Sequence, residues 1–184
     1  MLKGKKVRLR SVEKKDIDFF HGLWNDEEIT RFDGCYHIPP SKEFILENFY
    51  KIMNIDKKFL TILNEEKILI GYISYSGLKD LGGNYEIGVT IAKNYWHKGY
   101  AQDAIKTILR FLFMNKGAHR VELEVVDLNE RAIKCYLNCG FTKEGVRRNR
   151  YFVEGQYRNV ILMSILKEEY LKEAGIVYKN KMDT

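Results

Sequence analysis

The chain has 184 residues, of which 45% are hydrophobic and 30% carry charge. This length suits one domain with a hydrophobic core, and this composition is that of a soluble globular protein. The formal net charge of +6 is compatible with an anionic ligand, an anionic surface or a nucleic acid. Because the basic residues are spread along the chain in short clusters, they favour an anionic cofactor and a solvated surface over direct nucleic-acid binding.

Two further classes of protein are disfavoured by the sequence. No apolar run approaches the length of a membrane span, and residues 1–6 lack the apolar segment of a signal peptide. The cysteines Cys35, Cys135 and Cys139 form no Cys-x-x-Cys pair, and no histidine completes a metal set with them. We therefore expect reduced thiols, a cytoplasmic location, and neither a metal ion nor a membrane as a partner.

The first third of the chain predicts a strand and two helices, over residues 6–10, 13–25 and 42–53. Ser11 and Ser41 are the expected N-caps of the two helices. Residues 26–40, which end in two prolines, are predicted to be irregular.

The remainder predicts strands and helices in alternation. Three strands are expected first, over residues 58–63, 67–78 and 85–91. They are followed by a helix over 102–115, a strand over 120–126, a helix over 129–138, strands over 141–150 and 157–166, and a helix over 167–174.

The segment Asn94-Tyr95-Trp96-His97-Lys98-Gly99-Tyr100-Ala101 joins a predicted strand to a predicted helix. The first turn of a helix has free backbone N–H groups and a partial positive charge, which together suit a phosphate. Gly99 allows close approach of the backbone to an anion, and Lys98 adds a charge. The spacing is equally that of an ordinary strand-to-helix connection. It matches neither a P-loop nor a dinucleotide-binding Gly-x-Gly-x-x-Gly motif.

Residues Trp96 to Ala101 resemble the pyrophosphate loop of the GCN5-related N-acetyltransferases (GNAT), Gln/Arg-x-x-Gly-x-Gly/Ala, with Trp96 at the first position. An aromatic residue followed by Lys-Gly-Tyr-Ala is similar to the branch that holds the RimJ/RimL-type and spermidine N-acetyltransferases. The segment 127–141, with Asn129, Tyr136 and Gly140-Phe141, resembles the second cofactor-binding segment of the same family. Residues 155–163 resemble the closing hairpin of that branch.

This resemblance implies an α+β (mixed α/β) fold in which helices flank a mostly antiparallel mixed sheet of about seven strands. The expected element order is β-α-α-β-β-β-α-β-α-β-β. One N-acetyltransferase domain would span residues 1–184, with a core over about 5–167 and a short C-terminal helix and tail.

The resemblance also implies that the chain binds acetyl-CoA. The residues it implicates in cofactor binding are Val89, Thr90, Ile91, Trp96, His97, Lys98, Gly99, Tyr100, Ala101, Gln102, Asn129, Arg131, Ala132 and Tyr136. In the family the pantetheine arm pairs with a strand that splays from its neighbour, often at a bulge, which Gly88 would permit. Asn129 could bind this arm or cap its own helix, and Arg131 and Lys134 could neutralise phosphates or be solvated.

Tyr136 and Glu86 are the candidate catalytic residues for transfer of an acetyl group to a primary amine. A tyrosine at the position of Tyr136 lies beside the thioester sulfur in the family and can protonate the leaving thiolate. Glu86 could accept the amine proton directly or through a water, and His97 is a weaker candidate. The alternatives are a core tyrosine and an edge carboxylate that faces water.

The acceptor amine is expected near the first two predicted helices and the closing hairpin. The candidate acceptor-binding residues are Trp24, Glu27, Glu28, Asp33, Tyr36, His37, Glu86 and Tyr151. Their carboxylates suit a polyamine, but the acids of the helix over 42–53 are offset by lysines. A protein N-terminus, an amino sugar or an aminoglycoside therefore stays open.

Two other classes of function are compatible with the sequence. One is a catalytically idle acetyl-CoA-binding sensor or regulatory module. The other is an RNA- or ribosome-associated protein, which depends on the basic charge only. The presence of both Glu86 and Tyr136 favours an enzyme, since a binder needs neither. The last strands and helix could form a homodimer, although nothing in the sequence requires one.

Overall fold

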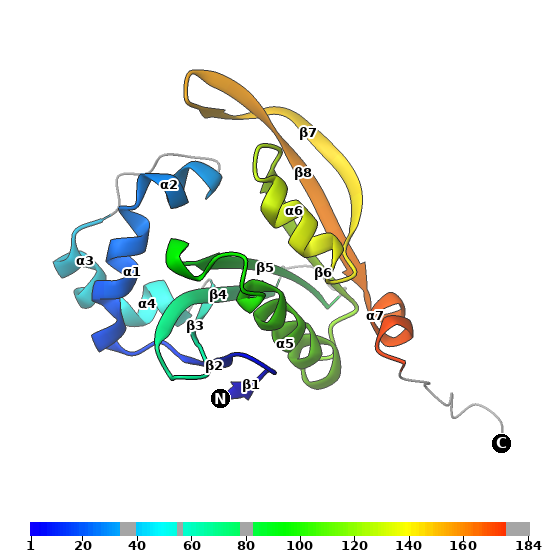
Figure 1. Ribbon diagram of the computed structural model, residues 1–184, viewed down its shortest axis with the longest axis horizontal. Helices are drawn as coiled ribbons and strands as arrows, with labels where there is room; N and C mark the ends of the chain where they lie inside the picture. The colour runs from blue at the N-terminus through cyan, green and yellow to red at the C-terminus, as the bar shows by residue number, and fades with distance from the viewer. Residues whose placement is uncertain (34–39, 55–56, 78–82, 176–184) are drawn as a thin grey trace.

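The computed structural model describes residues 1–33, 40–54, 57–77 and 83–175 (Figure 1). In these residues eight strands form one sheet in the order β1-β2-β3-β4-β5-β6-β8-β7. The strands are β1 (Leu2–Lys3), β2 (Arg8–Ser11), β3 (Lys58–Leu63), β4 (Leu69–Gly77), β5 (Asn84–Ile91), β6 (Arg120–Val126), β7 (Thr142–Val153) and β8 (Gln156–Leu166). Neighbouring strands are antiparallel except β5 and β6, which are parallel. A parallel pair needs a crossover connection, and α5 provides it.

The helices cover the sheet at different places (Figure 1). They are α1 (Ile17–Trp24), α2 (Glu27–Thr30), α3 (Lys42–Glu47), α4 (Phe49–Asn54), α5 (Tyr100–Asn115), α6 (Glu130–Leu137) and α7 (Lys167–Glu173). Short 3-10 turns are formed by Lys14–Asp16, Arg31–Asp33 and Lys93–Tyr95. Figure 1 shows α1 to α4 at one end of the sheet and the β7–β8 hairpin at the other, with α5 and α6 between them.

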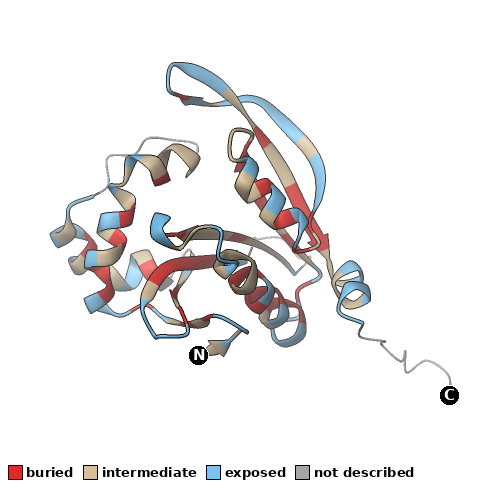
Figure 2. Ribbon diagram, in the orientation of Figure 1, coloured by how far each residue is buried: buried red, intermediate tan, exposed pale blue. Residues whose placement is uncertain are grey.

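The apolar core has a large part under α5 and a smaller part under α1, α3 and α4. The buried residues Ile105, Ile108 and Leu112 pack from α5 against strand residues that include Ile73 and Val121. Figure 2 shows this buried side of α5, whereas β7 is exposed along most of its length. The predicted helical period of α5 therefore describes how it packs.

Several predicted boundaries in the first third are wrong. Ser11 ends β2 rather than capping a helix, and α1 begins only at Ile17. The predicted irregular segment contains α2, because Asp26 accepts hydrogen bonds from the N–H groups of Glu28 (3.0 Å) and Ile29 (3.4 Å).

Other predicted elements differ less from the structure. Ser41 does cap α3, through a 3.2 Å bond from the Phe44 N–H. The helix expected over 42–53 is divided at Asn48, whose side chain donates to the Phe44 carbonyl (2.9 Å). The first hairpin strand, expected to end near residue 150, continues to Val153.

The sheet opens between β5 and β6. Along the described stretch 84–126 these strands pair at Asn84–Arg120, Tyr85–Val121 and Glu86–Glu122. Beyond these residues they no longer pair with each other, although β5 stays paired with β4 and β6 with β8. The β4–β5 register runs without a shift past Gly88, so the bulge that Gly88 would permit does not interrupt this ladder. Gly88 instead makes room for a neighbour, since a Cβ there would lie 3.3 Å from Ser74 Oγ. The opening comes from the divergence of two strands.

The hairpin of β7 and β8 contains an irregularity. Its register passes from Arg147–Val160 to Tyr151–Arg158, so residues 148–150 stand opposite Asn159. Asn149 has a positive φ of 50°, and its N–H donates to Asn159 Oδ1 at 3.0 Å. The side chain of Asn159 thus fills the place of a missing ladder bond.

Asp16 connects the 3-10 turn before α1 to β2. Its side chain is 4% exposed and accepts hydrogen bonds from Arg10 at 2.7 and 2.9 Å and from the Glu13 N–H at 2.9 Å. Burial raises the pKa of the Asp16 carboxyl, but the bonds from Arg10 and Glu13 and the charge of Arg10 outweigh it. The net pKa therefore lies below its ordinary value, and the charged form is favoured in the folded chain.

We expect Asp16→Asn to lower the free energy of unfolding by about 3 kcal/mol, because it leaves the Arg10 charge without its partner. A carboxyl whose pKa is depressed on folding stabilises the fold fully above its unfolded pKa of about 3.9, and this stabilisation is lost as pH falls through the folded pKa. Urea unfolding at several pH values should show this acid dependence reduced in the variant. Asp18→Asn, which removes an exposed pair with Lys42, should cost under about 1 kcal/mol. Equal losses in the two variants would contradict this account.

Candidate functional site

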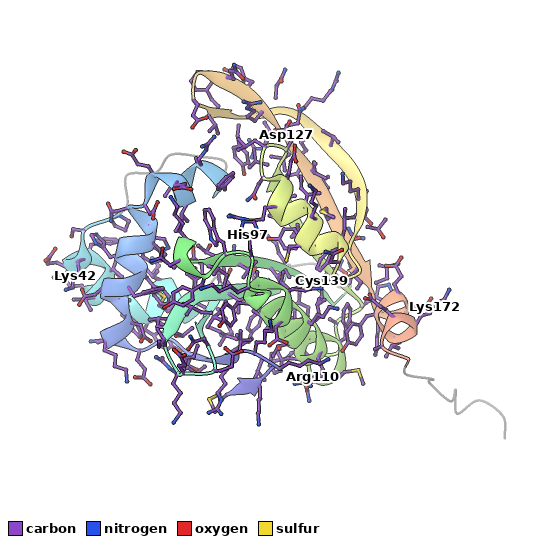
Figure 3. The ribbon with its side chains drawn as sticks, viewed as in Figure 1. Lys42, His97, Arg110, Asp127, Cys139 and Lys172 are labelled. Carbon is purple, nitrogen blue, oxygen red and sulfur yellow. The ribbon has the colours of Figure 1, made fainter. Side chains whose placement is uncertain are left out.

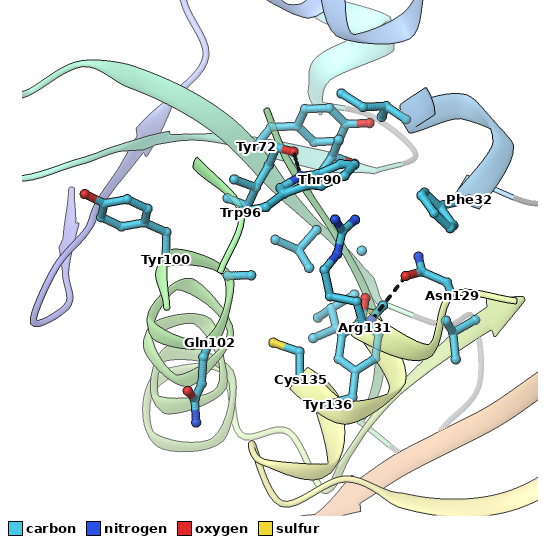
Figure 4. A pocket seen from close by; sticks show the side chains of 18 of the residues that line it. Phe32, Tyr72, Thr90, Trp96, Tyr100, Gln102, Asn129, Arg131, Cys135 and Tyr136 are labelled. Atoms are coloured by element: carbon cyan, nitrogen blue, oxygen red, sulfur yellow. Dashed lines mark hydrogen bonds between the residues drawn. The ribbon is translucent and has the colours of Figure 1, made fainter. Parts of the chain in front are cut away.

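A cavity of about 1070 Å³ lies where β5 and β6 diverge (Figure 4). Most of its wall is formed by β5, the turn before α5, the first turn of α5, the end of β6, and α6, and residues of β3, β4, β7 and the 3-10 turn after α2 complete it. The predicted site residues that line it are Glu86, Val89, Thr90, Ile91, Trp96, His97, Gly99, Tyr100, Ala101, Gln102, Asn129, Arg131, Ala132, Tyr136 and Tyr151. Predicted residues up to 65 positions apart, Glu86 and Tyr151, therefore meet in one cavity.

Other predicted residues lie elsewhere. In the part of the chain that the structure describes, Trp24, Glu27, Glu28 and Lys98 are not in the cavity wall. Trp24 reaches it indirectly, because its Nε1 donates to the hydroxyl of Tyr72, a wall residue, at 3.3 Å.

The remaining acceptor candidates were not all placed. Glu28 forms an ion pair with Lys93. Tyr36 and His37 lie outside the described residues, as does the side chain of Asp33.

The turn before α5 has an unusual backbone. His97 and Gly99 have positive φ values of 60° and 81°, and Gly99 is the N-cap of α5. The first N–H groups of a helix have no partner within it, and the residues that carry them here, Gly99 to Gln102, line the cavity. Figure 3 shows His97 near the middle of the molecule, with α1 on one side of it and α6 on the other.

The N-terminal segment supports this turn. The carboxylate of Asp103, in the first turn of α5, accepts the N–H groups of Lys5, Lys6 and Val7 at 3.1, 2.7 and 2.9 Å. The Lys6 Nζ in turn donates to the Lys98 carbonyl at 3.0 Å. Lys6 was not a predicted site residue, because 92 positions separate it from Lys98 and no local pattern joins them.

Arg131 extends from α6 across the cavity toward Trp96 (Figure 4). Its guanidinium carbon lies 3.3 Å from the centre of the Trp96 ring and 5.4 Å from that of Phe32. Burial lowers the pKa of this guanidinium, and the charge of Glu28 opposes the change. The Trp96 Nε1 donates to the Ile91 carbonyl at 2.6 Å, which fixes the ring. Trp96 thus acts as a platform for a cation.

Tyr136 and Glu86 occupy different walls of the cavity. Tyr136, on α6, is 7% exposed, and its ring centre lies 5.8 Å from that of Phe141. Glu86, on β5, is 40% exposed at its side chain, and its Oε1 lies 3.8 Å from the Nζ of Lys57. A phenol on α6 and a carboxylate on β5 therefore line the same cavity.

Asn129 caps its own helix, since its Oδ1 accepts the Ala132 N–H at 3.1 Å (Figure 4). Lys134 lines the cavity but forms an exposed 3.9 Å pair with Glu130.

Sequence reasoning missed wall residues from the 3-10 turn after α2, from the region of β3 and β4, from β6 and from α6. They include Phe32, Lys57, Phe59, Tyr72, Ser74, Glu124 and Cys135. For Tyr72 and Ser74 a signal existed, because alternation on β4 places them opposite Thr90 and Gly88. Among the described residues, no group of His, Cys, Asp and Glu could hold a metal ion. Within the same ranges, the helices are too short or too polar to cross a membrane.

Comparisons with known proteins agree with this geometry. The family model of the acetyltransferase (GNAT) domain matches residues 6–142 of the sequence. The spermidine N(1)-acetyltransferase of Vibrio cholerae is 28% identical over 171 residues, covering 91% of this chain and 97% of that protein. The Escherichia coli enzyme of the same name is 29% identical, covering 91% of this chain and 89% of its own length.

Solved structures give the same result. The crystal structure of Vibrio cholerae spermidine N-acetyltransferase in complex with CoA and spermine superposes with a TM-score of 0.82 at 28% identity, covering 90% of this chain and 98% of that one. The family model spans well over half of the sequence, and the fold has the expected mixed sheet with flanking helices. The chain belongs to the GNAT family of N-acetyltransferases.

Proposed function

We propose that the chain transfers the acetyl group of acetyl-CoA to a primary amine of a small molecule, by direct attack of the amine on the thioester. One observation carries this proposal: a single cavity joins the glycine turn at the start of α5 to Glu86 on β5 and Tyr136 on α6. The names of the similar enzymes, which act on spermidine, support a small amine as acceptor.

The residues of the cavity fit acetyl-CoA. Its pyrophosphate needs several N–H donors and positive charge, which residues 99–102 and the nearby Lys6 can supply. Its pantetheine arm is rich in amides and can pair with the β5 edge at Val89–Ile91, where β6 has diverged. A cavity of about 1070 Å³ is large enough for such a ligand.

Acetyl-CoA supplies an acyl group activated as a thioester, and the chain then has to manage two protons. An alkyl ammonium must lose a proton before its nitrogen can attack, and the Glu86 carboxylate can accept it, directly or through a water. The phenol of Tyr136 is protonated at neutral pH and can donate to the leaving sulfur. A backbone N–H near Val89 can stabilise the negative charge that develops on the carbonyl oxygen.

A cationic acceptor such as a polyamine is the first candidate. Glu86 and Glu124 both line the cavity, and their carboxylates could bind ammonium groups after exchange with Lys57 and Arg147, their present partners. Peptide N-termini, amino sugars and aminoglycosides belong in the same panel, because each also carries a primary amine.

We expect Gly99→Ala to weaken CoA binding about tenfold, the equivalent of one lost hydrogen bond to a charged group. An alanine at φ of 81° is strained, so the turn should shift away from the anion. Gly117→Ala is a matched control, because Gly117 follows the other end of α5 with a φ of 69° and open space around it. Calorimetric titration with CoA should separate the two variants. Equal affinities would show that the Gly99 turn does not bind the pyrophosphate.

We expect Tyr136→Phe to lower kcat about 100-fold or more with little change in CoA affinity, because the ring stays and the proton donor is lost. Thiol release from acetyl-CoA with the amine panel measures this effect. Tyr75→Phe is the control, since Tyr75 is a buried core tyrosine outside the cavity wall. Tight CoA binding without turnover of any amine would favour the idle binding module instead.

We expect Glu86→Gln to lower kcat/KM about 100-fold near pH 7, with a smaller deficit as pH approaches the amine pKa of about 10. At high pH the acceptor is deprotonated in solution, so a base is less necessary. Glu122→Gln is the control, because Glu122 pairs with Glu86 across the sheet without lining the cavity. A pH-independent deficit would assign Glu86 to binding rather than to proton transfer.

A further inference from the structure

Lys57 lies immediately before β3 and lines the same cavity as Tyr136. Its Nζ is 3.8 Å from Glu86 Oε1, and the two side chains are 38% and 40% exposed. An ion pair between such partly exposed groups contributes little to the stability of the fold. Its value here is that it shows how close the Lys57 amine comes to Glu86. The chain therefore holds one of its own primary amines beside the carboxylate proposed to deprotonate acceptor amines.

The other cations around the cavity differ from Lys57 in chemistry or in place. Arg147, which pairs with Glu124, and Arg131 carry guanidinium groups, which stay protonated and do not act as acyl acceptors. Lys134 is also a primary amine in the cavity wall, but its Nζ pairs with Glu130 at 3.9 Å rather than with Glu86, and 75% of its side chain is exposed. Lys57 combines a primary amine, a place in the cavity wall and contact with Glu86.

We infer that Lys57 is an acetylation site of the chain itself, with acetyl-CoA as the donor; this rests on the proposed function. The Lys57 ammonium gives one proton to Glu86, and its nitrogen then bonds to the acetyl carbon. The carbon–sulfur bond breaks as Tyr136 protonates the sulfur. The nitrogen loses its second proton, which restores the Tyr136 phenol, and Glu86 passes its own proton to water. The products are an amide at Lys57, free CoA thiol and one proton released to water, so no oxidant or further reactant is needed.

Acetylation of Lys57 has a consequence for the acceptor end of the cavity. An amide carries no charge, so the pair with Glu86 is lost and this carboxylate can bind the ammonium of an incoming amine. Lys57→Gln imitates the neutral state. It should lower KM for a cationic acceptor by up to about fivefold, which is the range of an exposed ion pair, and leave KM for acetyl-CoA unchanged.

The test is to incubate the purified chain with acetyl-CoA in the absence of any amine and to locate acetyl groups by tandem mass spectrometry. Lys57 should be acetylated at least about tenfold faster than its neighbour Lys58, which lies exposed on β3 and outside the cavity wall. The rate should not depend on protein concentration if the reaction is intramolecular. Tyr136→Phe should reduce the Lys57 rate to that of Lys58.

A second measurement needs no turnover. Reductive methylation with ¹³C-formaldehyde labels lysine amines, and the Lys57 signal is identified by its loss in Lys57→Arg. Addition of CoA should shift this signal and leave that of Lys58 in place. An unshifted Lys57 signal would place the amine away from the reacting end and overturn the inference.

The outcomes separate this inference from the proposed function. Turnover of a small amine with Lys57 unmodified overturns the inference and leaves the function intact. Equal acetylation of Lys57 and Lys58, or acetylation of Lys57 that survives Tyr136→Phe, indicates uncatalysed chemistry and also overturns it. If CoA binds but neither Lys57 nor any amine is acetylated, both fail.

Discussion

The end of β5–β6 pairing after Glu86 and Glu122 is the constraint on which the site depends. Because these strands are parallel, their connection must cross the sheet, and α5 starts beside the end of β5 where the strands have parted. The same divergence leaves a β5 edge open and places α6, which follows β6, opposite it. An anion site, an open strand edge and a facing helix thus result from one topological feature.

The stack of Arg131 on Trp96, with Phe32 nearby, joins three parts of the chain that no ladder connects: α6, the turn before α5, and the segment after α2. A cation over the face of an indole ring is attracted by the ring's negative electrostatic potential, and this attraction becomes stronger as water is excluded. The bond from Trp96 to the Ile91 carbonyl also ties this platform to the end of β5. The two walls of the cavity are therefore coupled through one guanidinium.

Prediction from sequence succeeded where a pattern is local. The period of α5 and the alternation of β6 each follow from a few neighbouring residues, and the glycine expected at the start of the helix is the N-cap of α5. It failed where the partner is distant: Lys6 on the Lys98 carbonyl, Lys57 on Glu86, and Phe32 beside Arg131. The break at Asn48 and the start of α2 at Asp26 each depend on side-chain hydrogen bonds to the backbone, which residue type alone does not decide.

The irregular register of β7 bears on how two copies of the chain could associate. β7 is an edge strand of the sheet. Its irregular residues 148–150, opposite Asn159, include Arg148 and Arg150, and Arg147 comes directly before them. Like charges and a bulge both oppose the addition of another strand to an edge. The edge at β7 is therefore disfavoured as a place where a strand of a second copy could extend the sheet.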